Sequence, residues 1–220
     1  MTVFGGALLG GDTVRAAGPL MVGVTAIGEV PAGTMVRRMT AAIGDVLCVS
    51  GTIGDAALGL PFRRSPLPDW GDAIGEDACA TLVDRYWHPR PRLGLAPILR
   101  HHARAAMDIS DGLAGDLAKM LKGEGRSALI RLGDVPLSPA AARAVAQAPN
   151  LMDTVLTGGD DYEILCAVAP ENLAVICAAA AAAGIPLHPI GTVTGGDAPP
   201  AFEASDGSRK TFAAASFSHF

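Results

Sequence analysis

The sequence is poor in cysteine and has none of the usual cysteine patterns. Its 220 residues include four cysteines, none of which forms a Cys-x-x-Cys pair, and no histidine lies at metal-ligand spacing from them. A zinc site and the disulfide framework of a small secreted protein are therefore not expected. Three of the four stand in apolar runs, so we interpret them as small core residues.

Charge and long hydrophobic runs are also scarce. Charged residues make up 18% of the chain and apolar residues 50%, which argues against disorder over most of its length. The net charge of −5 argues against a general nucleic-acid or membrane-surface binder. The longest apolar run, over 173–184, is shorter than the ~20 residues that span a bilayer, and no signal-peptide pattern opens the chain. We therefore expect a cytoplasmic protein with no nucleic-acid or membrane partner.

Neither common nucleotide-binding fingerprint is present, because the chain lacks both Gly-x-Gly-x-x-Gly and Gly-x-x-x-x-Gly-Lys-Ser/Thr. Apolar and β-branched runs predict strands over 20–28, 45–50, 103–109, 127–132, 162–168 and 187–194, and a hairpin over 202–212. Periodicity and cap residues predict helices over 56–60, 73–87, 93–101, 111–122, 140–147 and 171–183. This alternation does not follow a strict βα order, so it favours an α+β or mixed-sheet sandwich fold over a Rossmann fold.

Two glycine-linked acidic segments are candidates for metal and phosphate chemistry. The sequence GGDT over 10–13 places a hard oxygen ligand on a turn that a ligand could approach closely. The sequence DISDG over 108–112 lies between a predicted strand and a predicted helix, where a helix N-terminus favours phosphate and carboxylates could hold divalent ions. An ordinary turn and a helix cap are the alternative interpretations of these two segments.

Two further segments could contact a ligand. The sequence GGDDYE over 158–163 sets adjacent carboxylates on a glycine loop before a strand, which suits a cationic or hydrogen-bond-donating substrate. The alternative is a turn in which Asp161 is a charge at the strand edge. Arg37 and Arg38 form an arginine pair of the kind that binds phosphate, although surface solvation would explain it equally well.

Taken together, the motifs resemble thiamine-monophosphate kinases of the aminoimidazole-ribonucleotide-synthetase superfamily. LLGGDTVR, GDVLCVSGTIGDAALGL, MDISDGLAGDLAKM, LTGGDDYEIL and the terminal HF occur in the family's order along essentially the whole chain. The resemblance implies an α+β fold: an αβ sandwich C-terminal domain over 44–220, and over 1–43 a remnant of the N-terminal α/β domain that binds ATP and magnesium. It also implies ATP-dependent phosphorylation of thiamine monophosphate to thiamine diphosphate, with Mg2+ as cofactor, in a cytoplasmic homodimer.

The resemblance also implies roles for individual residues. Those expected to contact ATP are Gly11, Asp12, Arg38 and Ser110. The expected magnesium ligands are Asp12, Asp108 and Asp111, which would then form one cluster near Ser110, and Asp160 is expected to contact the substrate. No protein nucleophile is expected, since family members transfer the phosphoryl group directly between the two substrates.

The sequence also departs from the family's pattern. Typical members begin with a further stretch that supplies several magnesium ligands, and the chain shows none of that stretch. Ala214 stands where an aromatic residue can cover the substrate. We therefore expect the chain alone to be a poor kinase. The alternatives are a non-catalytic remnant and another ATP-dependent enzyme of the superfamily, such as a synthetase or a hydrogenase-maturation protein.

Overall fold

The structure is a computed structural model that describes residues 5–15, 17–123 and 125–212. The chain divides into two units, Met1–Met35 and Val36–Phe220. The boundary expected between residues 43 and 44 stays a prediction, because the division into units does not test which domain each part belongs to.

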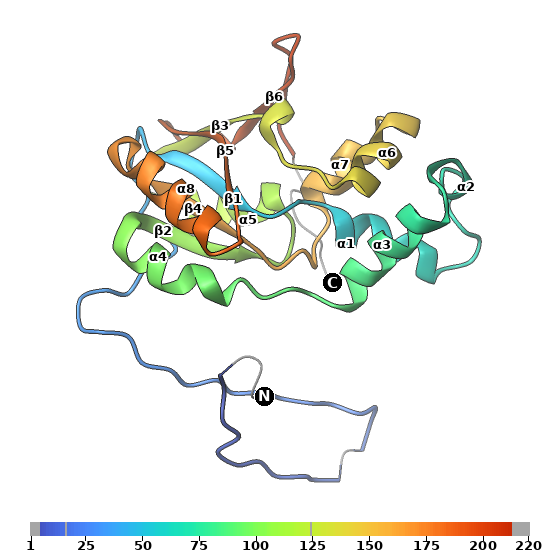
Figure 1. The fold of residues 1–220 in the computed structure, drawn as a ribbon, viewed down its shortest axis with the longest axis horizontal. Coiled ribbons are helices and arrows are strands. Elements are labelled where there is room, and N and C mark those ends of the chain that lie inside the picture. Colours follow the sequence, from blue (N-terminus) through green and yellow to red (C-terminus); the bar gives the residue numbers. More distant parts are fainter. Residues whose placement is uncertain (1–4, 16, 124, 213–220) are drawn as a thin grey trace. The chain divides into compact units, whose positions relative to one another are not determined.

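The second unit is built on a mixed β-sheet (Figure 1). Its strands are β1 (Val46–Ser50), β2 (Ala103–Ile109), β3 (Arg126–Arg131), β4 (Glu163–Val168), β5 (Leu187–Gly195), β6 (Ala201–Glu203) and β7 (Arg209–Lys210). They lie in the order β2-β4-β1-β5-β3-β6-β7. Neighbouring strands are antiparallel except β3 and β6, which are parallel. Strands that are adjacent in the sheet are therefore mostly far apart in sequence.

Helices join most of these strands. They are α1 (Asp55–Gly59), α2 (Gly71–Ile74), α3 (Glu76–Trp87), α4 (Ala96–His102), α5 (Leu113–Leu121), α6 (Pro139–Gln147), α7 (Leu151–Thr157) and α8 (Leu173–Ala182). Short 3-10 helices cover Leu60–Arg63, Leu93–Leu95, Leu132–Asp134 and Pro170–Asn172. None of the helices in the described ranges has the length and apolar character needed to cross a membrane.

The central strands β1 and β4 are buried on both faces because helices cover both sides of the sheet. Leu47 and Leu165 point into a core shared with α1, α3, α5, α6 and α7. Cys48 and Cys166, one position further along their strands, point into a second core with α4 and α8. Figure 1 shows α4 and α8 together on one side and α1, α3, α6 and α7 gathered on the other. The alternation of side chains along a strand explains why these two strands have continuous apolar sequences.

Most elements of this unit were predicted from the sequence. The strands expected over 45–50, 103–109, 127–132, 162–168 and 187–194 are confirmed, as is the hairpin of β6 and β7. The helix expected over 73–87 is interrupted at Gly75, whose φ of 87° lies outside the helical region and separates α2 from α3. Helix α7 was not predicted, because its sequence LMDTVLT is shorter than two helical turns.

The strand predicted over 20–28 is wrong. The described residues of Met1–Met35 form neither helix nor strand, and Leu20, Val22 and Val24 are 77–93% exposed. An apolar run becomes a buried strand only where neighbouring strands pair with it and a core covers it. The described part of this unit supplies neither.

We predict that the exposed apolar side chains of this first unit drive association. Large contiguous apolar surfaces promote contacts between chains. Size-exclusion chromatography with light scattering should therefore show dimers or larger species. Replacing Leu20, Val22 and Val24 together by lysine should shift the population toward monomer. A stable monomer of the unaltered chain would contradict the prediction.

Candidate functional site

The candidate site forms where two loops meet at one end of the β2–β4 pair. Ile109 at the end of β2 lies opposite Glu163 at the start of β4. Beyond that pair, the N–H of Tyr162 donates to the carbonyl oxygen of Ile109 (2.8 Å), and the N–H of Asp160 donates to that of Ser110 (2.9 Å). These bonds hold the sequences DISDG and GGDDYE side by side.

The glycines of the second loop are required by this close approach. A Cβ atom on Gly159 would overlap the carbonyl oxygen of Ser110, and one on Gly158 would overlap the Cβ of Ala57 in α1. Gly112, in the first loop, has a φ of 113° and lies against the backbone of Thr157. The loops can meet only because these positions carry no side chain.

Two residues of the second loop have unusual backbone conformations. Asp160 has a φ of 70° and Tyr162 a φ of 51°. Positive φ is uncommon outside glycine, and for a bulky residue it is a genuine outlier. Such conformations persist where surrounding contacts impose them, and they concentrate at ligand sites. The loop therefore fixes the directions of the Asp160 and Tyr162 side chains.

A cavity of about 370 Å³ opens beside these loops. It is lined by Ala57, Leu60, Pro61, Arg64, Ser110, Asp111, Thr154, Gly158, Gly159, Asp160 and Tyr162. One wall is the segment from α1 to Arg64, and the other consists mainly of the two loops. We call this space the loop cavity.

Tyr162 also borders a second, more apolar cavity of about 480 Å³. This second cavity is lined by Pro89, Pro91, Arg92, Leu93, Ala96, Leu99, Asp108, Tyr162 and Ile164. The Tyr162 hydroxyl lies 3.5 Å from Asp160 Oδ1. Partial burial, together with the negative charges of Asp160, Asp108 and Asp111, raises the pKa of Tyr162. Tyr162 is therefore a protonated phenol at the border of the two cavities, surrounded by carboxylates.

Asp116 in α5 holds the first loop in place. Its Oδ2 accepts hydrogen bonds from the N–H groups of Ser110 (3.0 Å) and Asp111 (2.9 Å). Its Oδ1 accepts one from Lys119, which also binds Asp111. Burial lowers the pKa of Lys119, but the bonds to Asp111 and Asp116 outweigh it, so the pKa is raised. The Ser110 and Asp111 N–H groups are therefore already occupied by a carboxylate, whereas the sequence suggested phosphate there.

The alternative interpretation of Asp161 as a charge at the strand edge is wrong. Its side chain is buried, and its Oδ2 accepts a hydrogen bond of 2.7 Å from the N–H of Gly54, ahead of α1. A longer contact of 3.4 Å joins its Oδ1 to the N–H of Ala56. Burial, reinforced by the nearby charges of Asp55 and Glu163, raises the pKa of Asp161 to about 8 despite these two bonds. Asp161 therefore joins the two walls of the loop cavity instead of facing a ligand.

Glu163 is fully buried and anchors the start of β4. Its carboxylate accepts hydrogen bonds from Arg85 Nη2 (3.0 Å), Arg92 Nε (2.7 Å) and Ser50 Oγ (2.6 Å), and Arg92 Nη2 also binds it. The hydrogen bonds to Glu163 raise the pKa of Arg92. A buried charge requires this degree of pairing. The network fixes Arg92 at the edge of the second cavity.

The same network reaches α1 through Asp55. Arg85 Nε lies 3.8 Å from Asp55 Oδ2, which also accepts a bond of 2.7 Å from Thr52. Ser138 donates to Asp55 Oδ1 (2.5 Å), while its own oxygen accepts the N–H of Ala141 and so caps α6. The polar interior thus connects α1, α3, α6 and β4.

The structure brings together some of the predicted site residues. Ser110, Asp111 and Asp160 line the loop cavity, and Asp108 lines the adjoining one. Arg38 lines neither cavity and is exposed in a turn whose neighbour Arg37 pairs with Ala105, toward the other end of β2.

The remaining predicted site residues lie elsewhere. Gly11 and Asp12 belong to the first unit, where Asp12 accepts a hydrogen bond from the N–H of Thr13 (2.8 Å). Ala214 lies outside the described residues. Within residues 5–15, 17–123 and 125–212, no three His, Cys, Asp or Glu side chains are arranged to hold a metal ion. Asp12 belongs to one unit and Asp108 and Asp111 to the other, so the cluster expected from these three stays a prediction.

Sequence reasoning missed several residues of the site. Arg64 stands between Pro61 and Pro66, Arg92 follows Pro91, and nothing in their spacing links these arginines to the acidic motifs. The structural roles of Asp116 and Glu163 depend on burial by distant segments. For Tyr162 a signal existed, because it lies within GGDDYE, but its side chain was read only as part of a strand.

Comparisons with known proteins show which sequences this chain resembles. Residues 42–199 match the family model described as AIR synthase related protein, C-terminal domain. The chain is 42% identical over 193 residues to a thiamine-monophosphate kinase of Caulobacter vibrioides, a match covering 86% of this chain and 53% of that protein.

Solved structures show the same fold. The thiamine-monophosphate kinase of Stenotrophomonas maltophilia has a TM-score of 0.69 at 30% identity, covering 80% of this chain and 54% of that one. A structure described as AaThiL complexed with AMPPCP and TMP has a TM-score of 0.66 at 26% identity, covering 84% of this chain and 54% of that one. The chain spans about half the length of the curated relatives it matches.

We predict that Asp161 makes stability fall as pH rises. A carboxyl group whose pKa is about 8 when folded and about 4 when unfolded binds its proton more tightly in the folded state. The stability it confers is complete below pH 4 and is lost as pH rises to about 8, with a slope of at most about 1.4 kcal/mol per pH unit. Urea unfolding between pH 4.5 and 8.5 should show this loss in the unaltered protein and not in Asp161→Asn.

Asp69→Asn is the matched control, because Asp69 is exposed in the loop before α2. It should keep the pH profile of the unaltered protein. Parallel profiles for the unaltered protein and Asp161→Asn would show that the Asp161 carboxyl does not bind its proton more tightly on folding.

Proposed function

The chain belongs to the family of AIR synthase related proteins, matching its C-terminal domain, and on that premise we propose that it takes part in the ATP-dependent phosphorylation of thiamine monophosphate to thiamine diphosphate. The observation that carries this proposal is the loop cavity, where Ser110 and Asp111 from one motif meet Asp160 from another. The similarity to a thiamine-monophosphate kinase at 42% identity supports it.

In this proposal the phosphate-binding and substrate-binding residues come from separate segments. Gly11, Asp12, Arg38 and Ser110 contact ATP, and Asp160 contacts thiamine monophosphate. An AMPPCP-bound relative supports the nucleotide role, since AMPPCP is an analogue of ATP. Ser110 and Asp160 are joined through the backbone bond between their loops, so the two substrates would meet at this point.

Magnesium fits the donor chemistry of the site. Mg2+ is usually held by one or two carboxylates together with substrate phosphates, and the described residues offer Asp108 and Asp111 on either side of Ser110. We propose these two, with Asp12, as its ligands. Bound magnesium would neutralise charge on the reacting phosphates. Lys119 already neutralises Asp111, so it would hold that carboxylate in position before a cation binds.

The reaction requires positioning more than covalent chemistry. A terminal phosphate oxygen of thiamine monophosphate would attack the γ-phosphate of ATP, with no protein nucleophile. The backbone at Asp160 and Tyr162 and the Asp116 bonds to the first loop keep the lining side chains fixed, which is what in-line transfer demands. We further propose that the protein acts in the cytoplasm as a homodimer.

A non-catalytic nucleotide-binding role is the second candidate. It is favoured by the finding that no three potential metal ligands come together in the part of the chain that the structure describes. Another ATP-dependent enzyme of the superfamily would use the same nucleotide residues and differ at Asp160. Product formation separates all three alternatives.

The proposed function predicts that a chimera will be an active kinase. We would join this chain to the part of the Caulobacter vibrioides kinase that it does not match, and measure thiamine diphosphate formed from ATP, Mg2+ and thiamine monophosphate. Asp108→Asn should lower kcat by about 100-fold or more, because misplaced ions align the phosphates poorly. Asp134→Asn, near neither cavity, should not change it. A folded but inactive chimera would refute the kinase assignment.

The chain alone should turn over poorly. Its described carboxylates supply too few metal ligands to neutralise two phosphate groups. Incubating the purified chain with ATP, Mg2+ and thiamine monophosphate should yield almost no thiamine diphosphate, although weak binding of MgATP is expected. Abundant product that disappears in Asp108→Asn would show that the chain holds a sufficient set of ligands.

A further inference from the structure

The loop cavity has charges of opposite sign on its two walls. Arg64 comes from the wall that runs from α1 through the 3-10 helix Leu60–Arg63. Asp111 and Asp160 come from the facing loops. Arg64 is the one lysine or arginine among the residues that line this cavity.

The two kinds of charge do not neutralise each other. In the described part of the chain no ion pair joins Arg64 to Asp111 or Asp160, and Asp111 pairs instead with Lys119 at 2.5 Å. The Arg64 side chain is exposed. The cavity therefore presents a guanidinium group on one wall and carboxylates on the other, each able to bind a ligand charge.

We propose that Arg64 binds the phosphate of the acceptor substrate, and that the loop cavity takes a ligand with a cationic ring at one end and a phosphate at the other. This inference rests on the proposed function and deepens it, since thiamine monophosphate has this distribution of charge. Asp160 and the Tyr162 ring bind the cationic end, because carboxylates and aromatic faces both attract cations. Arginine is well suited to phosphate, which it can bind through two parallel hydrogen bonds.

The charge pattern also separates the two substrates. A nucleoside triphosphate carries only negative charge on its phosphates, so it approaches the Asp111 and Asp160 carboxylates through the magnesium that accompanies it and has no cationic end of its own. A ligand with both charges meets an opposite charge on each wall, and such complementarity selects one partner over another. The volume of about 370 Å³ lies within the usual range for small-molecule sites.

The test compares thiamine monophosphate with thiamine, which differ only in the phosphate, and with MgAMPPCP as an analogue of MgATP. Thiamine monophosphate, thiamine and MgAMPPCP are titrated into the full chain by calorimetry. The unaltered chain should bind thiamine monophosphate about tenfold to a hundredfold more tightly than thiamine, as expected for one charge-assisted contact. Arg64→Met should abolish that difference and leave thiamine binding unchanged, and Arg64→Lys should restore part of it.

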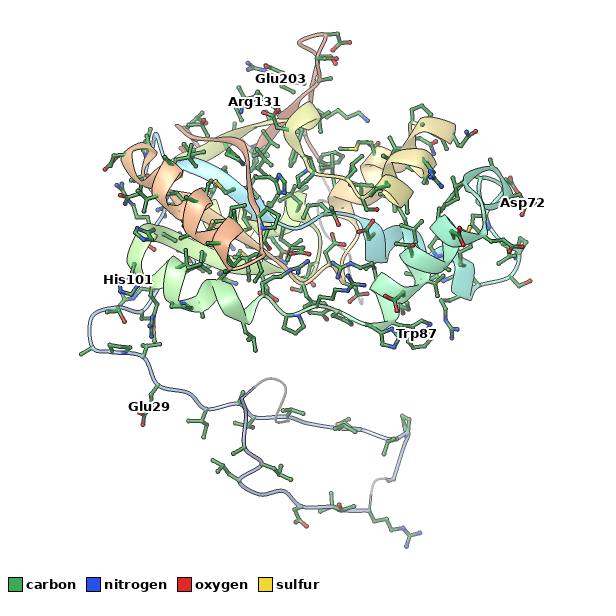
Figure 2. All side chains as sticks on the ribbon, viewed as in Figure 1. Glu29, Asp72, Trp87, His101, Arg131 and Glu203 are labelled. Carbon is green, nitrogen blue, oxygen red and sulfur yellow. The ribbon has the colours of Figure 1, made fainter. Side chains whose placement is uncertain are left out.

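Arg63 provides the matched control. It is the preceding residue, but its guanidinium stacks over the Trp87 ring, 4.2 Å from the ring centre, and it does not line the cavity. Figure 2 shows Trp87 at the C-terminal end of α3. Arg63→Met should leave all three affinities unchanged. Asp160→Asn should weaken thiamine and thiamine monophosphate equally, because both carry the cationic ring.

The outcomes distinguish this inference from the proposed function. If Arg64→Met still prefers thiamine monophosphate over thiamine, or weakens both equally, Arg64 does not bind the phosphate, while the kinase proposal stands. A loss confined to MgAMPPCP would assign Arg64 to the nucleotide and overturn the inference. If the unaltered chain binds neither thiamine compound, the acceptor assignment of the cavity fails as well.

Discussion

A single buried carboxyl group joins the two walls of the loop cavity. Asp161 belongs to the loop before β4, yet it accepts the N–H of Gly54 at the start of α1. The residues on either side of it, Asp160 and Tyr162, have positive φ values and direct their side chains to the cavity. The cavity therefore depends on a residue that does not face it, and the strained backbone around Asp161 is held by this bond.

The polar interior around Asp161 also explains its charge state. Asp55, Asp161 and Glu163 lie near one another, and two guanidinium groups, those of Arg85 and Arg92, approach them. If all five groups were ionised, the buried cluster would carry a net negative charge, which is unfavourable away from water. When Asp161 is protonated, the two remaining carboxylates and the two guanidinium groups give the cluster no net charge. The raised pKa of Asp161 therefore follows from its burial beside Asp55 and Glu163 in the same interior that holds the loop cavity together.

The sequence predicted the elements whose patterns are local and failed where tertiary contacts decide. Strands β1 and β4 have continuous apolar runs, and α6 has a serine cap and a proline at its first position, so their existence could be read directly. The run at 20–28 has the same apolar character, but no described strand pairs with it. For the site, motif order placed Ser110, Asp111 and Asp160 together. Arg64 could not be found this way, because its relation to them is spatial. The sequence pattern placed Asp161 either beside a ligand or at the strand edge, because burial of a carboxyl group leaves no local signal.

Gly158 and Gly159 provide clearance for neighbouring segments in the fold. A Cβ atom on Gly159 would press on the carbonyl oxygen of Ser110, and one on Gly158 would press on Ala57 of α1, so replacing either would push the loop away from that neighbour even if the new residue tolerated the same φ and ψ. On the opposite wall, Leu60 and Pro61 are half-buried and Arg64 is exposed. Tolerance to substitution should therefore be unequal across the cavity. The loop wall would stay constant in sequence, while the α1 wall is where a change of ligand preference could arise without loss of the fold.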